Sequence, residues 1–400
     1  MGGQDNSGLC FAYVGGSRGS SGAQPVALHI AAEVLGLKYS DMALGAWAES
    51  DIVLDTGSQG GSAWSGGAGS GFYNAALLMR NKLFERAVTL APFVTLTGTG
   101  VTKATATATV TNGQVSAITV TNGGTGYSGP PSITFTPATG AGGAGATAVA
   151  AINSSGVVTG IVVTFGGIGY TAAPTVVVSG LTPNDLDAKN SSIFLKSDPT
   201  KTTTHAAVTS GMTPFIAVSG GWAANFRRAP STGLPGTGAL QAKIGDTAMC
   251  TGSCSTAVEV AVDTDTGEVE VTGMWNYIHT GTSLFKQGCM KEIGSGAELI
   301  IGETIFYGDV YDAPTAAVLQ MAHGSFMQMT SLDFNPASFH LKDVETDDVA
   351  APCGGRGIAE PCCGDISAIE NAIFNATGKW VDPEHGAMTP DKVLKALGKA

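Results

Sequence analysis

Glu360 is the residue of this chain whose surroundings most strongly suggest chemistry. It lies near the end of a glycine-rich stretch, residues 354–361, shortly before the helical pattern of residues 366–377. Glycines allow the backbone to approach a bulky ligand closely and to adopt positive φ where a turn needs it. A carboxylate in such a loop, with no second acidic residue beside it, can act as a general base. The alternative is a helix-start residue favoured by the helix dipole.

Two neighbouring patterns indicate the elements that would position this loop. Residues 258–271 alternate apolar and polar side chains around an Asp-Thr-Gly turn, which predicts a β-hairpin. Near the end of the chain, Thr389 is a suitable helix N-cap and Pro390 a suitable first helical residue. We therefore expect a short terminal helix there.

The first hundred residues predict two helices joined by a strand and a glycine-serine loop. Apolar side chains recur at helical spacing over residues 23–37, with a stop at Gly36, and again over residues 73–88. Residues 42–44 are strand-like, and residues 56–71 are rich in glycine and serine. Backbone amides in such loops at helix N-termini can bind phosphate and heterocycle edges, whereas the alternative is a plain flexible connection.

Residues 100–180 differ in character because they contain an internal repeat. The pattern of residues 117–127 recurs at 160–170, with an offset of about 43 residues between Tyr127 and Tyr170. Each copy is followed by a proline and a β-rich run, and alternating Thr and Val with Gly-Gly turns predicts antiparallel strands. The repeat resembles modules of phage tail and bacterial surface proteins. We expect a role in packing or subunit contact, with carbohydrate or surface binding as the alternative.

Composition limits the class of protein. With 400 residues and 43% hydrophobic content, the chain can bury a large core in roughly two or three domains. A formal charge of -12 argues against nucleic acid as a partner. The sequence shows neither a long apolar run nor a signal peptide, so we expect a cytoplasmic protein without a membrane anchor. The seven cysteines lack the spacing of a zinc or iron–sulfur site and are expected to be thiols.

Taken in order, several segments resemble the molybdenum hydroxylases, the xanthine oxidase and carbon monoxide dehydrogenase family. Residues 354–360 are similar to the family's Gly-x-Lys/Arg-Gly-x-Gly-Glu loop, residues 388–394 to its closing Leu-Thr-Pro-Glu-Lys-Val-Leu segment, and residues 258–271 to its Thr-Gly-Glu-Val hairpin. The resemblance implies an α+β fold, the molybdopterin-binding domain of this family with an inserted all-β repeat module. The expected parts are residues 1–98, the inserted module 99–180, and residues 181–400 with the catalytic loop.

The resemblance also implies the site. Glu360 would be the catalytic base. No protein metal ligand is expected, because molybdenum in this family is held by dithiolene sulfur. The residues expected to bind the cofactor are Gly16, Ser17, Arg18, Gly19, Gly67, Ala68, Gly69, Ser70, Glu292, Arg356, Gly357, Ile358 and Ala359.

The chain departs from the family at three places. Arg18 stands where the family has a pterin-contacting Gln, although Arg can still donate two hydrogen bonds to phosphate. Glu292 places a carboxylate where an amide meets the cofactor. At residues 279–281 the family's His-Asp-Cys-Gly lacks its Asp, and we interpret His279 as a structural histidine.

The function implied is that of a molybdenum-cofactor-binding subunit of a multi-subunit hydroxylase or dehydrogenase that adds water-derived oxygen to a small organic substrate. The cofactor would be molybdopterin, in the dinucleotide form. The resemblance covers roughly residues 1–95 and 181–400 and only the C-terminal half of the family's large subunit, so a companion chain would carry the other half of the site. [2Fe-2S] clusters and FAD would be on partner subunits of the hetero-oligomer. Two alternatives stay open: a molybdenum-dependent hydratase acting on an activated C=C bond, and a non-catalytic β-repeat structural protein.

Overall fold

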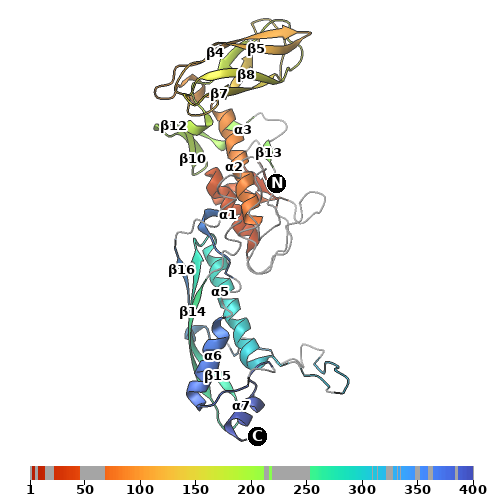
Figure 1. Cartoon of the computed structure of the whole chain (residues 1–400), viewed down its shortest axis with the longest axis vertical. Coiled ribbons are helices and arrows are strands. Elements are labelled where there is room, and N and C mark those ends of the chain that lie inside the picture. Colours follow the sequence, from red (N-terminus) through yellow and green to blue (C-terminus); the bar gives the residue numbers. More distant parts are fainter. Residues whose placement is uncertain are drawn as a thin grey trace. The chain divides into compact units, whose positions relative to one another are not determined.

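The computed structural model describes residues 2–4, 8–13, 22–45, 68–210, 216–218, 253–308, 310–312, 314–320, 328–330, 332–333, 335–346, 352–358, 364–382 and 386–399. Helices and strands are mixed, as the α+β prediction requires (Figure 1). The chain forms two compact units. The first contains Met1–Val14, Leu28–Val53 and Gly71–Gly221, and the second contains Gly15–Ala27, Leu54–Ser70 and Trp222–Ala400. The predicted boundaries at residues 98 and 180 fall inside the first unit, and that three-part division stays a prediction.

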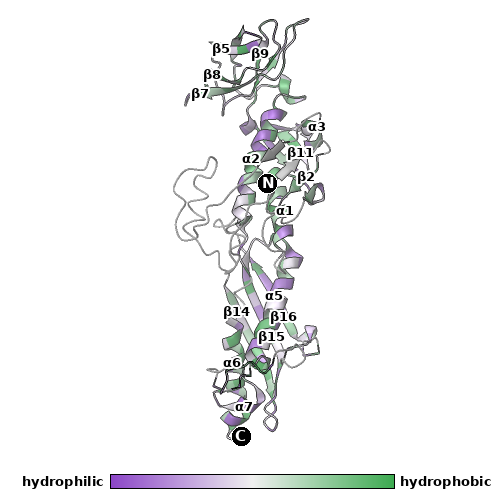
Figure 2. Cartoon of the chain, turned by 90° about the vertical axis from the view of Figure 1, so that its right-hand side faces the viewer, coloured by the Kyte–Doolittle hydropathy of each residue, from purple (hydrophilic) through white to green (hydrophobic). Residues whose placement is uncertain are grey.

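The two N-terminal helices form as expected, with one boundary wrong. Helix α1 spans Ala23–Leu35 and ends at Gly36, whose φ of 67° is the left-handed conformation typical of a helix C-terminus. Helix α2 spans Ala68–Ala87, so it begins five residues before the predicted start at residue 73. Hydrophobic and hydrophilic residues are both present along α2 (Figure 2). The added first turn includes Gly69 and Ser70, which have poor helix propensity but are buried in the structure.

The core of the first unit lies where these helices meet short strands. Fully buried side chains in it include Leu35, Met79, Leu83 and Phe93. One four-stranded sheet has the order β13-β1-β2-β3, and a three-stranded sheet has the order β10-β11-β12. The bounds are β1 Gly2–Gln4, β2 Cys10–Ala12, β3 Met42–Leu44, β10 Leu186–Lys189, β11 Ser192–Leu195, β12 Asp198–Thr204, β13 Ile216–Val218 and the short helix α3 His205–Thr209.

The repeat region is built of strands around a hydrophobic cluster of its own, as expected. Strands β5-β4-β9-β6 form one sheet and β7-β8 a second. The sheets meet where Ser132 bridges Val149 and where the Val115 N–H donates to the Gly166 carbonyl at 2.8 Å. The result is a small barrel-like body. Its strands are β4 Thr105–Thr111, β5 Gln114–Asn122, β6 Ile133–Thr136, β7 Thr147–Ile152, β8 Val158–Phe165 and β9 Thr175–Val178.

The sequence repeat is also a structural repeat. Tyr127 and Tyr170 are both buried, and their hydroxyls accept hydrogen bonds from Ala104 N–H at 2.9 Å and Ala146 N–H at 3.4 Å. Strand β9 of the second copy pairs with β4 of the first, and Ser132 ahead of β6 bridges β7 in the reciprocal way. The two copies therefore exchange strands about a pseudo-twofold axis.

The second unit contains the predicted hairpin. Strands β14, Cys254–Val262, and β15, Val269–Gly281, pair antiparallel around the turn at residues 263–268. Strand β16, Phe339–Glu345, adds in parallel to β15. Helices α5 and α6 run beside this sheet (Figure 1). Their bounds are α5 Lys286–Ile301, extended by a π-helical turn Gly302–Phe306, α6 Asp365–Thr377 and α7 Pro390–Leu397, as expected from residues 366–377 and 389–390.

Two general expectations concern membranes and thiols. Across the described ranges, no helix combines the length and apolar character needed to cross a bilayer. Four cysteines fall in those ranges, Cys10, Cys254, Cys289 and Cys353, and none of them is joined in a disulfide. Burial raises the pKa of the Cys10 thiol to about 12, which keeps it protonated and unreactive at neutral pH.

Candidate functional site

The structure describes only part of the predicted site. Glu360, Ala359, Gly67 and the loop residues Gly16, Ser17, Arg18 and Gly19 lie outside the described residues. Ala68, Gly69 and Ser70 form the first turn of α2, a correction to the loop predicted for residues 56–71. Glu292 lies on α5, and Arg356, Gly357 and Ile358 follow the 3-10 turn Pro352–Gly354 in the second unit.

The loop that leads to Glu360 is held against the end of β15 by backbone contacts. Gly355 forms a bridge with Gly281. The Arg356 N–H donates to the Thr280 carbonyl at 2.9 Å, and the Thr282 N–H donates to the Gly354 carbonyl at 2.8 Å. Because these bonds involve the main chain on both sides, they fix the path of the loop independently of its side chains.

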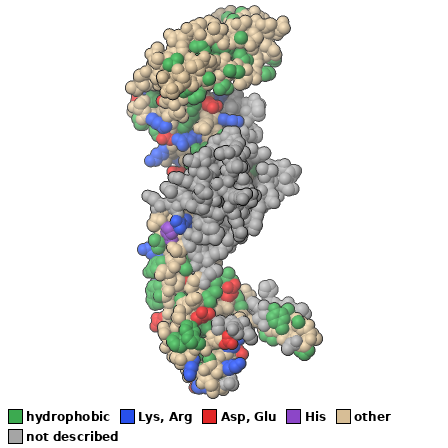
Figure 3. Space-filling view, in the orientation of Figure 1, with side chains coloured by type: hydrophobic (Ala, Val, Ile, Leu, Met, Phe, Trp, Pro, Cys, Tyr) green, Lys and Arg blue, Asp and Glu red, His purple; other side chains and the backbone are tan. Residues whose placement is uncertain are grey.

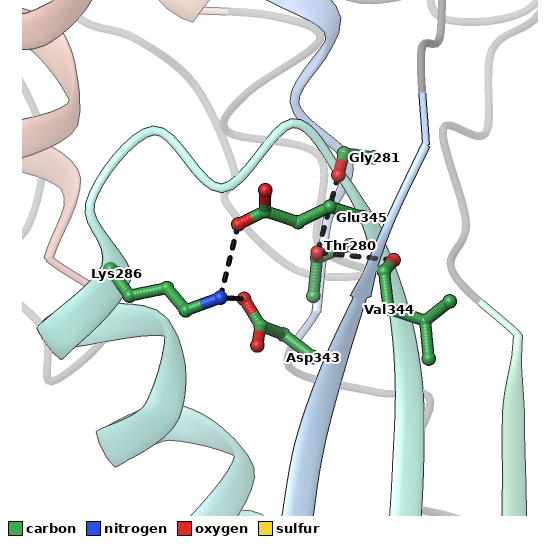
Figure 4. A network of polar contacts seen from close by, with 6 residues as sticks. All are labelled: Thr280, Gly281, Lys286, Asp343, Val344 and Glu345. Atoms are coloured by element: carbon green, nitrogen blue, oxygen red, sulfur yellow. Dashed lines mark hydrogen bonds and ion pairs between the residues drawn. The ribbon is translucent and has the colours of Figure 1, made fainter.

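A charged cluster reinforces this end of the sheet (Figure 4). Lys286, the first residue of α5, forms ion pairs with Asp343 and, at 3.1 Å, with Glu345, both on β16. The hydrogen bond to Asp343 is the main reason that the pKa of Lys286 lies above its ordinary value. A cation at a helix N-terminus is unfavourable for the helix dipole, so the two carboxylates stabilise a charge that α5 alone would disfavour.

The buried Thr280 side chain links β15 to β16. Its hydroxyl lies 3.3 Å from the Gly281 carbonyl and 3.4 Å from the Val344 carbonyl (Figure 4). The strand that supports the glycine-rich loop is thereby linked to β16 by side chain as well as by backbone.

An apolar cluster brings two of the predicted binding segments together. Ile358 of the loop packs on Ile278, Cys289 and Ile293, which come from β15 and α5. Glu292 precedes Ile293 on α5 and is partly buried. Residues 356–358 and the α5 segment around Glu292 are therefore neighbours within the second unit.

The other side of the Glu360 stretch is anchored by Asp365, which sequence reasoning missed. Asp365 is fully buried at the first position of α6. Its carboxylate accepts hydrogen bonds from the Thr256 hydroxyl and from the Asn276 amide, the latter at 2.5 Å. Burial raises the pKa of Asp365, and the two hydrogen bonds oppose that shift. An acidic residue at a predicted helix start was the available signal, although it gives no hint of burial.

The hydrogen bonds of His279 are made within the fold. Its ring Nε2 is hydrogen-bonded to the Thr346 hydroxyl, and its N–H donates to the Ser253 carbonyl at 2.8 Å. In the part of the chain that the structure describes, no group of three or more His, Cys, Asp or Glu residues is placed to hold a metal ion.

Several solved structures have a fold similar to that of this chain. A Cu,Mo-CO dehydrogenase in its carbon monoxide-reduced state matches with a TM-score of 0.62 and 12% identity over 100% of this chain and 37% of that chain. Quinoline 2-oxidoreductase from Pseudomonas putida 86 matches with a TM-score of 0.59 and 14% identity, over 100% and 38%. An aldehyde oxidoreductase from Desulfovibrio gigas matches with a TM-score of 0.51 and 15% identity, over 99% and 30%.

These likenesses establish the fold. The chain has the fold of part of each of the three matched chains, and it spans between 30% and 38% of their length. Neither a protein-family profile nor a curated protein matches the sequence.

Proposed function

We propose that this chain is the molybdenum-cofactor-binding part of a multi-subunit hydroxylase or dehydrogenase of the xanthine oxidase type, acting in the cytoplasm. The observation that carries the proposal is the agreement of two independent features. The fold matches oxidoreductase chains along its whole length, and the loop whose sequence resembles the family's catalytic loop is held on β15 by backbone hydrogen bonds.

Glu360 is the proposed catalytic base. It stands between two anchors on the same strand, Arg356 bonded to Thr280 and Asp365 bonded to Asn276. A general base is effective only when its carboxylate is held within hydrogen-bond reach of the proton that it accepts. The described residues on both sides of Glu360 are held in this way, which supports the proposed role.

Glycines in this loop would allow a bulky planar cofactor to approach the backbone closely. A Cβ on Gly355 would lie 2.9 Å from Leu284 Cδ1, so a side chain here would have to displace Leu284. The cofactor, proposed as the dinucleotide form of molybdopterin, would be held by residues 356–359, by Glu292 and by segments 16–19 and 67–70. When bound, it would supply the two-electron redox chemistry that amino-acid side chains lack. The chain itself would supply the base and the walls of the site.

The proposed substrate is a small organic molecule, and the proposed partners are a companion chain with the rest of the site and subunits that carry [2Fe-2S] and FAD. Residues 99–180 are proposed as an inserted module outside the catalytic part. The chain spans 37% of the CO dehydrogenase chain that it matches.

The test is to purify the chain from its host with its co-purifying subunits and to measure molybdenum, pterin and turnover. Glu360→Gln keeps the shape of the side chain but removes its basicity, so turnover should fall by about two to four orders of magnitude with molybdenum content unchanged. Glu370→Gln, a matched change on α6, should leave turnover near normal. A metal-loaded Glu360→Gln complex with normal turnover would refute the role of Glu360, and a purified complex without molybdenum would refute the function.

A further inference from the structure

His205 is a fully buried histidine that caps the end of helix α1. It is the first residue of α3, and only 1% of its surface is exposed. Its ring Nε2 lies 3.0 Å from the carbonyl of Leu35, the last residue of α1. A carbonyl can only accept a hydrogen bond, so the proton of the neutral ring is on Nε2. The ring thereby satisfies a carbonyl that the helix itself leaves without a partner.

The second ring nitrogen of His205 has a different environment. Within the part of the chain that the structure describes, Nδ1 is buried and has no hydrogen-bond partner. In the neutral ring Nδ1 has a lone pair, but in the imidazolium it carries a proton that needs an acceptor. Protonation would therefore bury a positive charge together with an unpaired N–H donor, which is unfavourable for the closed fold.

The segments around this ring are joined to one another by backbone hydrogen bonds. The His205 N–H donates to the Ser191 carbonyl at 3.4 Å, and the Ser191 N–H donates to the Gly36 carbonyl at 2.8 Å. The Lys38 N–H donates to the Ser191 hydroxyl at 2.8 Å. The end of α1, the turn between β10 and β11, and the start of α3 thus meet around the imidazole. Water can hydrate the ring only if these segments separate.

Two charges favour protonation of the ring, and burial opposes it. The Asp41 carboxylate and the negative end of the α1 dipole both attract a cation. Asp41 is partly exposed, however, and it already accepts the Ser191 hydroxyl at 2.5 Å, so its attraction is screened. Burial is the largest influence and lowers the pKa of His205 below its ordinary value of 6.5.

Other charged groups on the neighbouring elements offer the ring no strong partner. They are exposed, as Figure 3 shows for Lys and Arg side chains around β10 and β12, or they are bonded to other groups. These residues are Glu33, Lys38, Arg86, Asp187, Lys189, Asp198 and Lys201.

We propose that His205 is an acid-sensitive latch, which holds α1 to α3 while its ring is neutral and releases α3 when the ring is protonated. Protons bind preferentially to the open form, because only there can water hydrate the imidazolium. The stability that the neutral ring contributes is present above pH 6.5 and is lost as pH falls through the lower pKa of the folded state. The latch is independent of the proposed cofactor and its chemistry.

Hydrogen exchange measured by mass spectrometry tests the latch on the full chain with any subunits that co-purify. The comparison is between about pH 5.5 and about pH 7.5, on either side of the ordinary histidine pKa. After correction for intrinsic rates, amides of residues 30–37 and 205–210 should open about five- to tenfold more at the lower pH. Linkage gives this ratio for a histidine that titrates normally only in the open form. Amides of β4 and β5 should not respond.

His205→Gln is the informative variant, because its amide can donate to the Leu35 carbonyl but carries no charge at any pH. The pH response of residues 30–37 and 205–210 should disappear in this variant. His29→Gln is the matched control. His29 lies on α1 with its ring stacked on Tyr39 at 4.2 Å, and burial lowers its pKa as well. This control should keep the wild-type response.

Exchange of the histidine Cε1 hydrogens gives a second measurement that needs no variant, and it decides the matter if His205→Gln does not fold. His205 should titrate with a midpoint below 6.5 in the wild type. A midpoint at or above 6.5 would overturn the proposal, as would equal amide exchange at the two pH values or an unchanged response in His205→Gln. A response lost in His29→Gln would assign the effect to His29, and an equal increase in β4 and β5 would indicate general acid unfolding. Either result would also overturn the latch.

Discussion

Gly281 and Gly354 lie backbone against backbone at the point where β15 meets the glycine-rich loop. A Cβ on Gly281 would fall 2.2 Å from the Gly354 carbonyl oxygen. Gly281 also has a φ of 62°, which residues with a side chain rarely adopt. The same carbonyl accepts the Thr282 N–H, so it cannot move away without loss of a hydrogen bond.

Gly281→Ala should therefore displace the loop. We expect a loss of about 2 kcal/mol or more in the free energy of unfolding, because both the backbone strain and the clash with a main-chain oxygen oppose the native geometry. Cofactor content should fall as well. Urea unfolding followed by fluorescence measures the first effect, and metal analysis measures the second. Gly294→Ala is the control, since its Cβ would meet only Leu341 Cδ1 at 3.6 Å inside α5. Equal unfolding midpoints for wild type and Gly281→Ala would contradict this account.

Asp365 predicts a specific dependence of stability on pH. Its pKa is raised above the ordinary value of 3.8, chiefly by burial. The folded state therefore binds this proton more tightly than the unfolded state does. The stability that comes from this protonation is present below pH 3.8 and is lost as pH rises through the folded-state pKa.

Asp365→Asn should remove that dependence. An Asn can accept from the Asn276 amide and donate to the Thr256 hydroxyl, so the variant should fold. The difference in melting temperature, wild type minus variant, should decline as pH rises from 3.8 toward neutrality. A difference that is constant over this range would show that Asp365 has no raised pKa. Asp365→Ala should be less stable than either, because it leaves the buried Asn276 amide and the half-buried Thr256 hydroxyl without their acceptor.

Lys286 should matter more for stability than an exposed lysine in a similar ion pair. Its partner Asp343 has a side chain only 5% exposed, whereas Lys399 pairs at 2.8 Å with Asp265, which is 89% exposed. Lys286→Met would leave the buried carboxylate of Asp343 without its cation. Lys399→Met would remove the cation only from the carboxylate of Asp265, which water already solvates. Thermal melts should show a clear decrease for Lys286→Met and little change for Lys399→Met. Similar melting temperatures for the two variants would show that Lys286 does not help to hold the loop in place.

Local signals determined which elements could be predicted. Gly36 at the end of α1, the Thr389-Pro390 start of α7 and the Asp263–Gly267 turn of the hairpin all act within a few residues, and all appear in the structure. The start of α2 was predicted too late. Its first turn consists of small residues, and the buried Gly69 and Ser70 give no apolar pattern that would mark the helix start.

Long-range contacts explain what the sequence could not indicate. Thr256, Asn276 and Asp365 belong to three segments that meet only when the hairpin and α6 are packed together. Likewise, Lys286 and Asp343 are separated by 57 residues. For residues 356–358, the family motif indicated a loop but not its support. The structure shows that backbone hydrogen bonds hold this loop on β15. The roles of Glu360 and of residues 16–19 stay predictions.

The repeat allows one last comparison between two equivalent tyrosines. The Tyr127 hydroxyl accepts the Ala104 N–H at 2.9 Å and donates to the Ser179 carbonyl at 3.3 Å, whereas the Tyr170 hydroxyl accepts the Ala146 N–H at 3.4 Å. Both rings are buried to the same extent. Phe replacement removes only the hydroxyl, so the hydrophobic contribution cancels between the two sites.

Tyr127→Phe should consequently cost about 1 kcal/mol more than Tyr170→Phe, because it leaves two buried backbone groups unpaired and breaks the shorter hydrogen bond. Denaturant unfolding of the two single variants and of the double variant measures the difference, and the effects should add because the sites are separate. An equal loss at both sites would mean that the hydroxyl hydrogen bonds contribute alike and that the pseudo-twofold symmetry of the barrel extends to its energetics.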